Sequence, residues 1–278
     1  MRTAAYASLP TEQRHPLTQR LNDLTTLQLL RLMNQEDAQL VRVVAGKLSS
    51  IARAIRLIAR TLKVGGRLFF VGAGTSGRLG VLEAAECPPT FHTSPSLIQA
   101  IMAGGPGAVF RSREGAEDNR LEARRVIRQK VKPTDGVVGI TASGVTPFVD
   151  AALVEASRLG ARTILLTCNI RSPIPAMVRI RIPVGPEILT GSTRLKSATA
   201  TKRVLNMLTV GTMVRLGRTS GNLMVDLRPI SRKLRARACR IIRLLTGCSE
   251  RRAAQLLKAS AGSVRAAVEL HKMSLWDR

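Results

Sequence analysis

The spacing of apolar residues changes along the chain, and each change predicts a different kind of element. From 37 to 62, apolar residues recur every three or four positions, which predicts a long amphipathic helix. A shorter helix is predicted over 25–32, with Thr25 or Thr26 as its N-cap. The next apolar run, 67–71, is short and enters a glycine-rich turn, so it predicts a strand.

Strands and helices are predicted to alternate through the middle of the chain. The predicted strands are 98–102, 136–140, 163–167 and 178–183, and the predicted helices are 78–85, 116–130, 148–159 and 193–216. Pro88 and Pro89 are expected to end the first of these helices just after Glu86. This alternation with short loops predicts an α/β fold in which helices cover both faces of a doubly wound parallel sheet.

Three regions follow from this pattern. We expect an N-terminal helical segment over 1–49, the α/β domain over 50–222 and a small C-terminal helical region over 223–278. The C-terminal region is strongly basic, and no internal repeat is present. No run approaches 18 apolar residues and no apolar leader begins the chain, so we expect neither a membrane span nor a secretory signal.

Composition adds an unusual charge to this picture. The chain has 278 residues, 45% of them hydrophobic, which suffices for a sizeable core and excludes a disordered protein. Its 44 basic and 18 acidic residues give a net charge of +26, a value typical of nucleic-acid binding. An aromatic content of 3% argues against stacking on single strands, but it leaves a phosphate-tracking surface open.

The cysteines and histidines lack the spacing of a metal site. The four cysteines are at positions 87, 168, 239 and 248, and no two of them form a C-x-x-C pair. Only three histidines accompany them, so we expect no zinc site. Reduced, mostly structural thiols are expected of a cytoplasmic protein.

Two glycine-rich loops, 72–77 and 141–147, each follow a predicted strand and precede a predicted helix. Such loops lie at the carboxyl ends of strands in open α/β sheets, where ligands bind, and the N–H groups of a helix N-terminus favour an anion. The first loop lacks the lysine of a nucleotide P-loop and the acidic residue of a dinucleotide site. The candidate ligand-binding residues are Gly74, Thr75, Ser76, Ser143, Gly144 and Thr146. The alternative is that both loops are only tight turns.

The scarce acidic residues are informative by their positions. None lies between Asp37 and Glu83, and Glu86 and Glu117 then follow. A general acid and a general base that face one substrate would account for this pair. The alternative is that each carboxylate is an ordinary ion-pair partner in a cationic protein.

A third candidate cluster lies at the start of the long helix predicted over 193–216. Ser192 or Thr193 is expected to cap this helix, with Lys196 in its first turn. A cation is unfavourable at a helix N-terminus, and an anionic ligand or an acidic neighbour would offset that cost. The alternative is that the lysine points to solvent.

Five runs of residues together resemble one family. They are GAGTSGRLG (72–80), AECPPTF (85–91), EGAED (114–118), GSTRLK (191–196) and NLMVD (222–226). All five resemble the N-acetylmuramic acid 6-phosphate etherases, which are sugar-isomerase (SIS) domain proteins related to the glucokinase regulatory protein. The resemblance spans roughly residues 10–270 and implies an SIS sugar-phosphate-binding domain over 50–222.

The resemblance implies a lyase that removes the D-lactyl ether of N-acetylmuramic acid 6-phosphate by elimination and then hydration, in cell-wall amino-sugar recycling. It gives Glu86 the role of proton donor and Glu117 that of the second catalytic glutamate. The hydroxyl residues of both glycine loops, with Ser192, Thr193 and Lys196, match substrate contacts. The family implies no metal or redox cofactor, a cytoplasmic location and a homodimer.

Some positions depart from the family pattern. Val145 stands where the family usually has arginine, and Ser197, Ala198 and Thr201 also differ. Glu83 replaces the usual aspartate and, three residues before Glu86 on one helical face, is expected to raise the pKa of that acid.

Three other functions are weighed against the lyase. A non-catalytic sugar-phosphate sensor of the glucokinase-regulatory type is favoured by Val145 and disfavoured by retention of Glu86 and Glu117. An aldose–ketose isomerase is disfavoured because the ECPP and EGAED runs are both present. A nucleic-acid binder rests on charge alone, so we expect no nucleic-acid partner.

Overall fold

A computed structural model describes residues 8–227 and 229–276. The chain divides into two compact units, and each is described by itself. The first contains the residues up to Ala84 together with Ser96–Thr212, and the second contains Ala85–Pro95 and the residues from Met213 onward.

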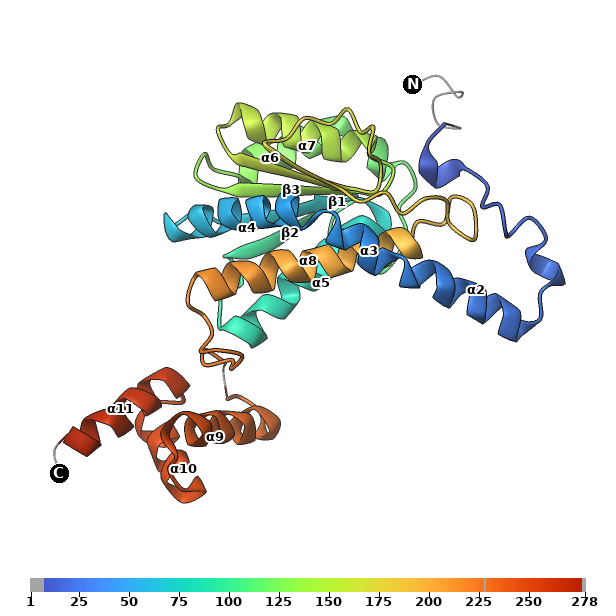
Figure 1. The fold of residues 1–278 in the computed structure, drawn as a ribbon. Coiled ribbons are helices and arrows are strands. Elements are labelled where there is room, and N and C mark those ends of the chain that lie inside the picture. The colour runs from blue at the N-terminus through green and yellow to red at the C-terminus, as the bar shows by residue number, and fades with distance from the viewer. Residues whose placement is uncertain (1–7, 228, 277–278) are drawn as a thin grey trace. The chain divides into compact units, whose positions relative to one another are not determined.

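A five-stranded parallel sheet forms the centre of the first unit (Figure 1). Its strands are β1 (Leu68–Gly72), β2 (Ile98–Met102), β3 (Gly136–Thr141), β4 (Arg162–Thr167) and β5 (Val178–Arg181). They lie in the order β2-β1-β3-β4-β5, and Leu68 pairs with both Ile98 and Gly136. The order reverses at β1, as in a doubly wound fold, and the predicted fold class is confirmed.

Helices cover the two faces of the sheet. Phe69, Val71 and Val137 lie on one face and share a core with α6 (Arg120–Lys130) and α7 (Pro147–Arg158). Figure 1 shows these two helices together on that side and α4 (Leu48–Lys63) on the other side.

Glycines allow two close approaches on the α4 side. A Cβ on Gly80 of α5 (Gly74–Phe91) would lie 2.8 Å from the Cβ of Phe70. A Cβ on Gly211 of α8 (Lys196–Arg215) would lie 2.7 Å from Cδ1 of Ile55 in α4. Any larger residue would push α5 away from β1 at the first position and α8 away from α4 at the second.

The N-terminal helices differ from the prediction. The single helix predicted over 37–62 is wrong, because the chain forms α2 (Thr26–Ala38), α3 (Leu40–Ala45) and α4 instead. The break before α4 falls at Gly46 and Lys47, and glycine is a poor residue for a helix interior. Thr25 is confirmed as the N-cap, since its side chain and that of Gln28 form a reciprocal capping box.

Helix α5 begins at Gly74 and continues through Pro88 and Pro89 to Phe91, so the expected break after Glu86 is wrong. Proline removes a backbone donor but keeps its carbonyl, and the Pro88 carbonyl accepts the N–H of His92 at 3.0 Å. The helix ends where His92 takes a left-handed φ of 52°. The stretch predicted as one helix over 116–130 is a short turn, η4 (Ala116–Asp118), followed by α6.

The second unit contains three helices in its C-terminal part: α9 (Arg232–Thr246), α10 (Glu250–Ala259) and α11 (Val264–Trp276). Their buried residues form one core that includes Ile241, Ile242 and Leu256. The helical nature of this region is confirmed. Among the described residues, no helix is long and apolar enough to cross a membrane.

Candidate functional site

A pocket at the carboxyl ends of β1 and β2 brings two of the predicted site residues together. Gly74, from the loop after β1, and Glu117, from η4, both line it, and its volume is about 150 Å³. Its other walls come from the end of β2 and from the 112–116 segment. This is the edge of the sheet where ligands bind in doubly wound folds.

Glu117 is the carboxylate of this pocket. Glu117 as a residue is exposed, but partial desolvation of its carboxyl group is the largest cause that raises its pKa above the usual range. The negative charges of Asp118 and Glu114 raise the pKa further. A carboxylate with a raised pKa is a stronger base, which suits proton abstraction.

Two arginines line the same pocket, and the sequence reasoning missed both. Arg78 donates from Nε and Nη2 to the carbonyl oxygens of Val109 and Ala108 at 2.8 and 2.9 Å, so it holds the loop after β2. The guanidinium of Arg113 lies beside Gly107, where an added Cβ would be 3.1 Å from Nη2. Arg113 directly precedes the EGAED run, and this position could have identified it as a site residue from the sequence.

The loop after β3 is held by its own hydroxyl groups. Thr141 Oγ1 lies 2.7 Å from Thr146 Oγ1 and 3.3 Å from Ser143 Oγ, and it accepts the N–H of Gly144 at 3.1 Å. Gly144 has a φ of 74°, and a Cβ there would lie 2.8 Å from Cβ of Asn169. Both the conformation and the space therefore require glycine at this position.

A second, neighbouring cavity connects this loop to the segment that carries Glu117. Val145 and Pro147 line it together with Asp118 and with Arg120, which forms an ion pair with Asp150. Its volume is about 450 Å³. The position where the family usually has arginine thus lies beside Asp118, the residue that follows Glu117.

The start of α8 differs from the prediction. Glu187, which is fully buried, accepts the backbone N–H groups of Lys196 and Ser197 at 2.9 Å each, so it caps the helix in place of Ser192 or Thr193. A carboxylate that binds two free N–H groups satisfies a helix N-terminus and favours its dipole. Ser192 and Thr193 lie half-buried in the turn before the helix.

The ammonium group of Lys196 is also buried and forms an ion pair with Glu36, which His15 Nε2 contacts at 3.1 Å. Burial opposes ionisation of Glu36, but hydrogen bonds from Lys196 and His15 more than offset it and lower its pKa. Lys196 was expected to face an anionic ligand, an acidic neighbour or solvent, and the structure shows an acidic neighbour, Glu36. Cys168 Sγ, just after β4, lies 3.9 Å from the Ser197 carbonyl, so this helix start also lies at the carboxyl edge of the sheet.

The other predicted residues lie along α5. Thr75 and Ser76 are half-buried in its first turn, next to Gly74. Glu86 is exposed on the part of the helix that belongs to the second unit. Glu83 is buried in the first unit, where it contacts Lys202 Nζ and Thr209 Oγ1. The positive charge of Lys202 offsets the negative charge of Glu83, which reduces the repulsion expected between Glu83 and Glu86.

The second unit has a larger and mainly apolar cavity of about 1020 Å³, between α9, α10 and the segment before them. None of the predicted site residues lines it. We therefore place the candidate active site at the smaller pocket, because that pocket holds a carboxylate with a raised pKa and the glycine loop.

Solved structures with a similar fold include phosphosugar isomerases. A putative phosphosugar isomerase from Bacteroides fragilis matches with a TM-score of 0.53 and 20% identity, over 69% of this chain and 92% of its own. A phosphoheptose isomerase from Neisseria gonorrhoeae matches with a TM-score of 0.51 and 16% identity, over 67% of this chain and 99% of its own. These likenesses show the SIS fold.

Sequence comparison is more specific. Residues 50–157 match the family model of the glucokinase regulatory protein N-terminal SIS domain. An N-acetylmuramic acid 6-phosphate etherase of Symbiobacterium thermophilum is 49% identical over 94% of this chain and 87% of its own length. One from Gloeothece citriformis is 48% identical over 96% of this chain and 88% of its own. The chain therefore belongs to the N-acetylmuramic acid 6-phosphate etherase family.

Proposed function

We propose that this protein removes the D-lactyl ether of N-acetylmuramic acid 6-phosphate, with Glu117 and Glu86 as its acid–base pair. Membership of the family makes it a carbon–oxygen lyase. The products are N-acetylglucosamine 6-phosphate and D-lactate. The observation that carries the assignment of roles is Glu117, which lies in the pocket beside the glycine loop with a raised pKa.

The chemistry needs one base and one acid. In the open-chain sugar, the C2–H bond is next to an aldehyde and is therefore acidic. The Glu117 carboxylate removes this proton, and the electron pair forms the C2–C3 double bond as the C3–O bond to the lactyl group breaks. Glu86, in its protonated form, donates a proton to the leaving lactyl oxygen.

Hydration completes the reaction. Water adds at C3 of the unsaturated aldehyde, Glu86 now accepts the proton of that water, and Glu117 returns its proton to C2. Each carboxyl group ends in the form in which it began, so no net proton is consumed. Both groups thus serve twice in one cycle.

The glycine loops supply the binding groups in this proposal. The N–H groups at the start of α5, with the hydroxyls of Thr75 and Ser76, are suited to the phosphate. In the second glycine loop, the hydroxyl groups of Ser143 and Thr146 lie close to that of Thr141. These hydroxyl groups are suited to sugar contacts. A pocket of about 150 Å³ has room for part of such a substrate, and small-molecule sites usually exceed 300 Å³.

The family resemblance assigns Lys196, Ser192 and Thr193 to the substrate, and in this proposal Ser192 and Thr193 keep that role. In the structure the ammonium of Lys196 contacts Glu36, so its role in this proposal is to fix the turn that carries the two hydroxyl residues. We further propose a cytoplasmic homodimer without a nucleic-acid partner. Light scattering on the purified protein gives the oligomeric state directly.

Incubation with N-acetylmuramic acid 6-phosphate in D₂O separates the two roles. The unmodified protein should release D-lactate and place deuterium at C2 of the product. Glu117→Gln should lose both, because no base removes the C2 proton. Glu86→Gln should still exchange the C2 proton of the substrate while lactate release falls.

Two results would contradict the proposal. One is that the unmodified protein releases no D-lactate. Tight binding of the sugar phosphate without turnover would then favour a regulator, which is the function named in the matching domain model. The other is retention of C2 exchange in Glu117→Gln, which would move the base elsewhere.

A further inference from the structure

A separate polar cavity lies at the opposite edge of the sheet, where β1 and β3 begin. Its volume is about 450 Å³, and it is formed by residues before β1, in β2, and at the end of α6. The lining residues are Arg67, Gln99, Arg128, Gln129, Lys130, Val131 and Lys132. The strands are parallel, so the length of the sheet separates this cavity from the Glu117 pocket.

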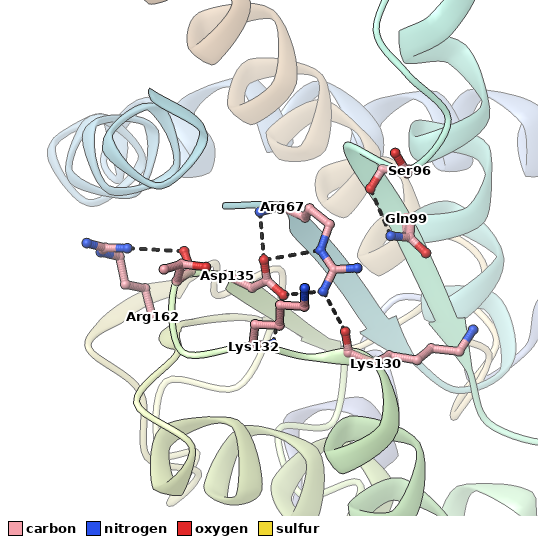
Figure 2. A network of polar contacts seen from close by, with 8 residues as sticks. Arg67, Ser96, Gln99, Lys130, Lys132, Asp135 and Arg162 are labelled. Carbon is pink, nitrogen blue, oxygen red and sulfur yellow. Dashed lines mark hydrogen bonds and ion pairs between the residues drawn. The ribbon is translucent and has the colours of Figure 1, made fainter. Parts of the chain in front are cut away.

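Arg67 lines this cavity, and its guanidinium is held by the polar contacts that Figure 2 shows. Its Nη2 donates to Asp135 Oδ2 at 2.7 Å and to the Lys130 carbonyl at 2.6 Å, and its Nε donates to Asp135 Oδ1 at 3.3 Å. The guanidinium also lies 5.0 Å from the ring centre of Phe69. The two N–H groups of Nη1 have no hydrogen-bond partner among the described residues, so a fixed pair of donors remains available.

Asp135 cannot neutralise the cavity as a whole. Its two oxygens already accept the backbone N–H groups of Arg67 and Lys132, at 2.8 Å each, besides the guanidinium. Burial alone would raise its pKa, but these hydrogen bonds more than offset burial and lower the pKa. The carboxylate is therefore saturated with donors from Arg67 and from the backbone of Lys132.

The remaining charges are unbalanced. Arg128 shares Glu155 with Arg158, and their hydrogen bonds lower the pKa of Glu155 to about 2. Lys130 and Lys132 are exposed and have no acidic partner among the described residues. Four cations line this cavity, and two of them, Arg67 and Arg128, are paired with Asp135 and Glu155. The charges of Lys130 and Lys132 are left unmatched.

We propose that this cavity binds a chain of two or three phosphates. The available donors are on three separate residues, Arg67, Lys130 and Lys132, which suits a chain of phosphates better than a single phosphate. The two Nη1 N–H groups of Arg67 supply fixed donors to phosphate oxygens, and the two lysines supply mobile point charges. The volume lies in the range of small-molecule sites.

The two glutamines add neutral groups that a bare phosphate chain would not need. Gln99 donates to the Ser96 carbonyl at 2.8 Å, which fixes its amide and leaves its oxygen as an acceptor at the cavity (Figure 2). Free triphosphate and a nucleoside triphosphate share the phosphate chemistry, so both are tested. Tighter binding of the nucleotide would identify it as the source of the phosphates, and equal binding would identify the free chain.

Isothermal titration calorimetry on the full chain tests the site with sodium triphosphate, ATP and orthophosphate, at a salt concentration near physiological. We expect one triphosphate per chain and binding at least tenfold weaker for orthophosphate. The double variant Lys130→Gln/Lys132→Gln should weaken triphosphate binding by about tenfold or more. The matched control Lys233→Gln/Lys272→Gln also removes two charges, at positions outside this cavity, and should change binding by less than about twofold.

Three outcomes would overturn the site. Equal weakening in both double variants would mean that triphosphate responds only to net charge. Displacement of triphosphate by saturating N-acetylglucosamine 6-phosphate would place it in the substrate site instead. No binding by the unmodified protein, with a lower melting temperature for Lys130→Gln/Lys132→Gln, would mean that the lysines only stabilise the C-terminus of α6. None of these readouts depends on lyase activity.

Discussion

The two edges of the central sheet hold carboxylates in opposite states. Asp135, at the amino edge, is buried and accepts four hydrogen bonds, and its pKa is lowered. Glu117, at the carboxyl edge, has no hydrogen-bond donor among the described residues, and its pKa is raised by burial and by two neighbouring acids. The donors around a carboxyl group, more than burial alone, decide whether the fold uses it for stability or leaves it for chemistry.

The largest effect is expected at the carboxyl edge. Glu117→Gln should lower the rate of D-lactate release about 1,000-fold, because general acid–base groups contribute factors of about 10² to 10⁴. The same change should leave the melting temperature at neutral pH equal or slightly higher. A carboxyl with a raised pKa resists ionisation in the folded state, so its charge costs stability at pH values above that pKa. A large drop in melting temperature would show that Glu117 is structural and would break the comparison.

The matched change at the amino edge should have the opposite result. Asp135→Asn should lower the free energy of unfolding by about 2–3 kcal/mol, since it removes a buried ion pair and weakens the acceptors of two backbone N–H groups. Lactate release per folded molecule should stay unchanged. Urea unfolding monitored by circular dichroism measures the loss.

The pH dependence of that loss follows from the lowered pKa of Asp135. A carboxylate of this kind stabilises the fold above its unfolded pKa of about 3.9, and the contribution disappears as the pH falls through the folded value. The difference between the unmodified protein and Asp135→Asn should therefore shrink below about pH 4. A difference that stays constant down to pH 2 would mean that the ion pair is not its cause.

A third carboxylate, Glu187, belongs with Asp135 in this comparison. Glu187→Gln keeps the size of the side chain but turns an NH₂ group toward one of the two helix N–H donors. We expect a loss of about 1–2 kcal/mol in unfolding free energy. The control Ser192→Ala/Thr193→Ala should cost less than about 0.5 kcal/mol, because neither hydroxyl caps α8. Equal costs for the two variants would restore the cap that the sequence predicts.

The sequence predicted what is periodic or local. Short apolar runs and glycine turns gave all five strands and the edge where the site lies, and the Thr25 cap follows from a local pattern. The sequence did not predict contacts between residues that lie far apart along the chain. Glu187 is nine residues before the N–H that it caps, and Asp135 is 68 residues from Arg67. The continuation of α5 through two prolines was also missed, because local propensity favours a break there.

The candidate site was predictable in part for the same reason. Gly74 and Glu117 are on separate motifs that the sequence singled out, and the fold brings them to one pocket. Arg113 was passed over because an arginine is common in a chain with a net charge of +26. The ion pair of Lys196 could not be predicted, because its partner Glu36 lies 160 residues away, beyond any local pattern.

The smallest expected effect is on the pH dependence of Glu117 itself. Asp118→Asn removes the first of the two negative charges that raise the pKa of Glu117, while the larger cause, burial, remains. The pKa should fall, so the acidic limb of the profile of kcat/KM against pH should move to lower pH by a small amount. The control is Glu122→Gln, which removes another exposed carboxylate, one that is paired with Arg125 in α6. This variant should leave the acidic limb of the profile in place. A shift to higher pH in Asp118→Asn, or an equal shift in both variants, would mean that the limb does not report Glu117. A shift in the expected direction would show that the neighbouring acids raise the pKa of Glu117, whereas hydrogen-bond donors lower that of Asp135.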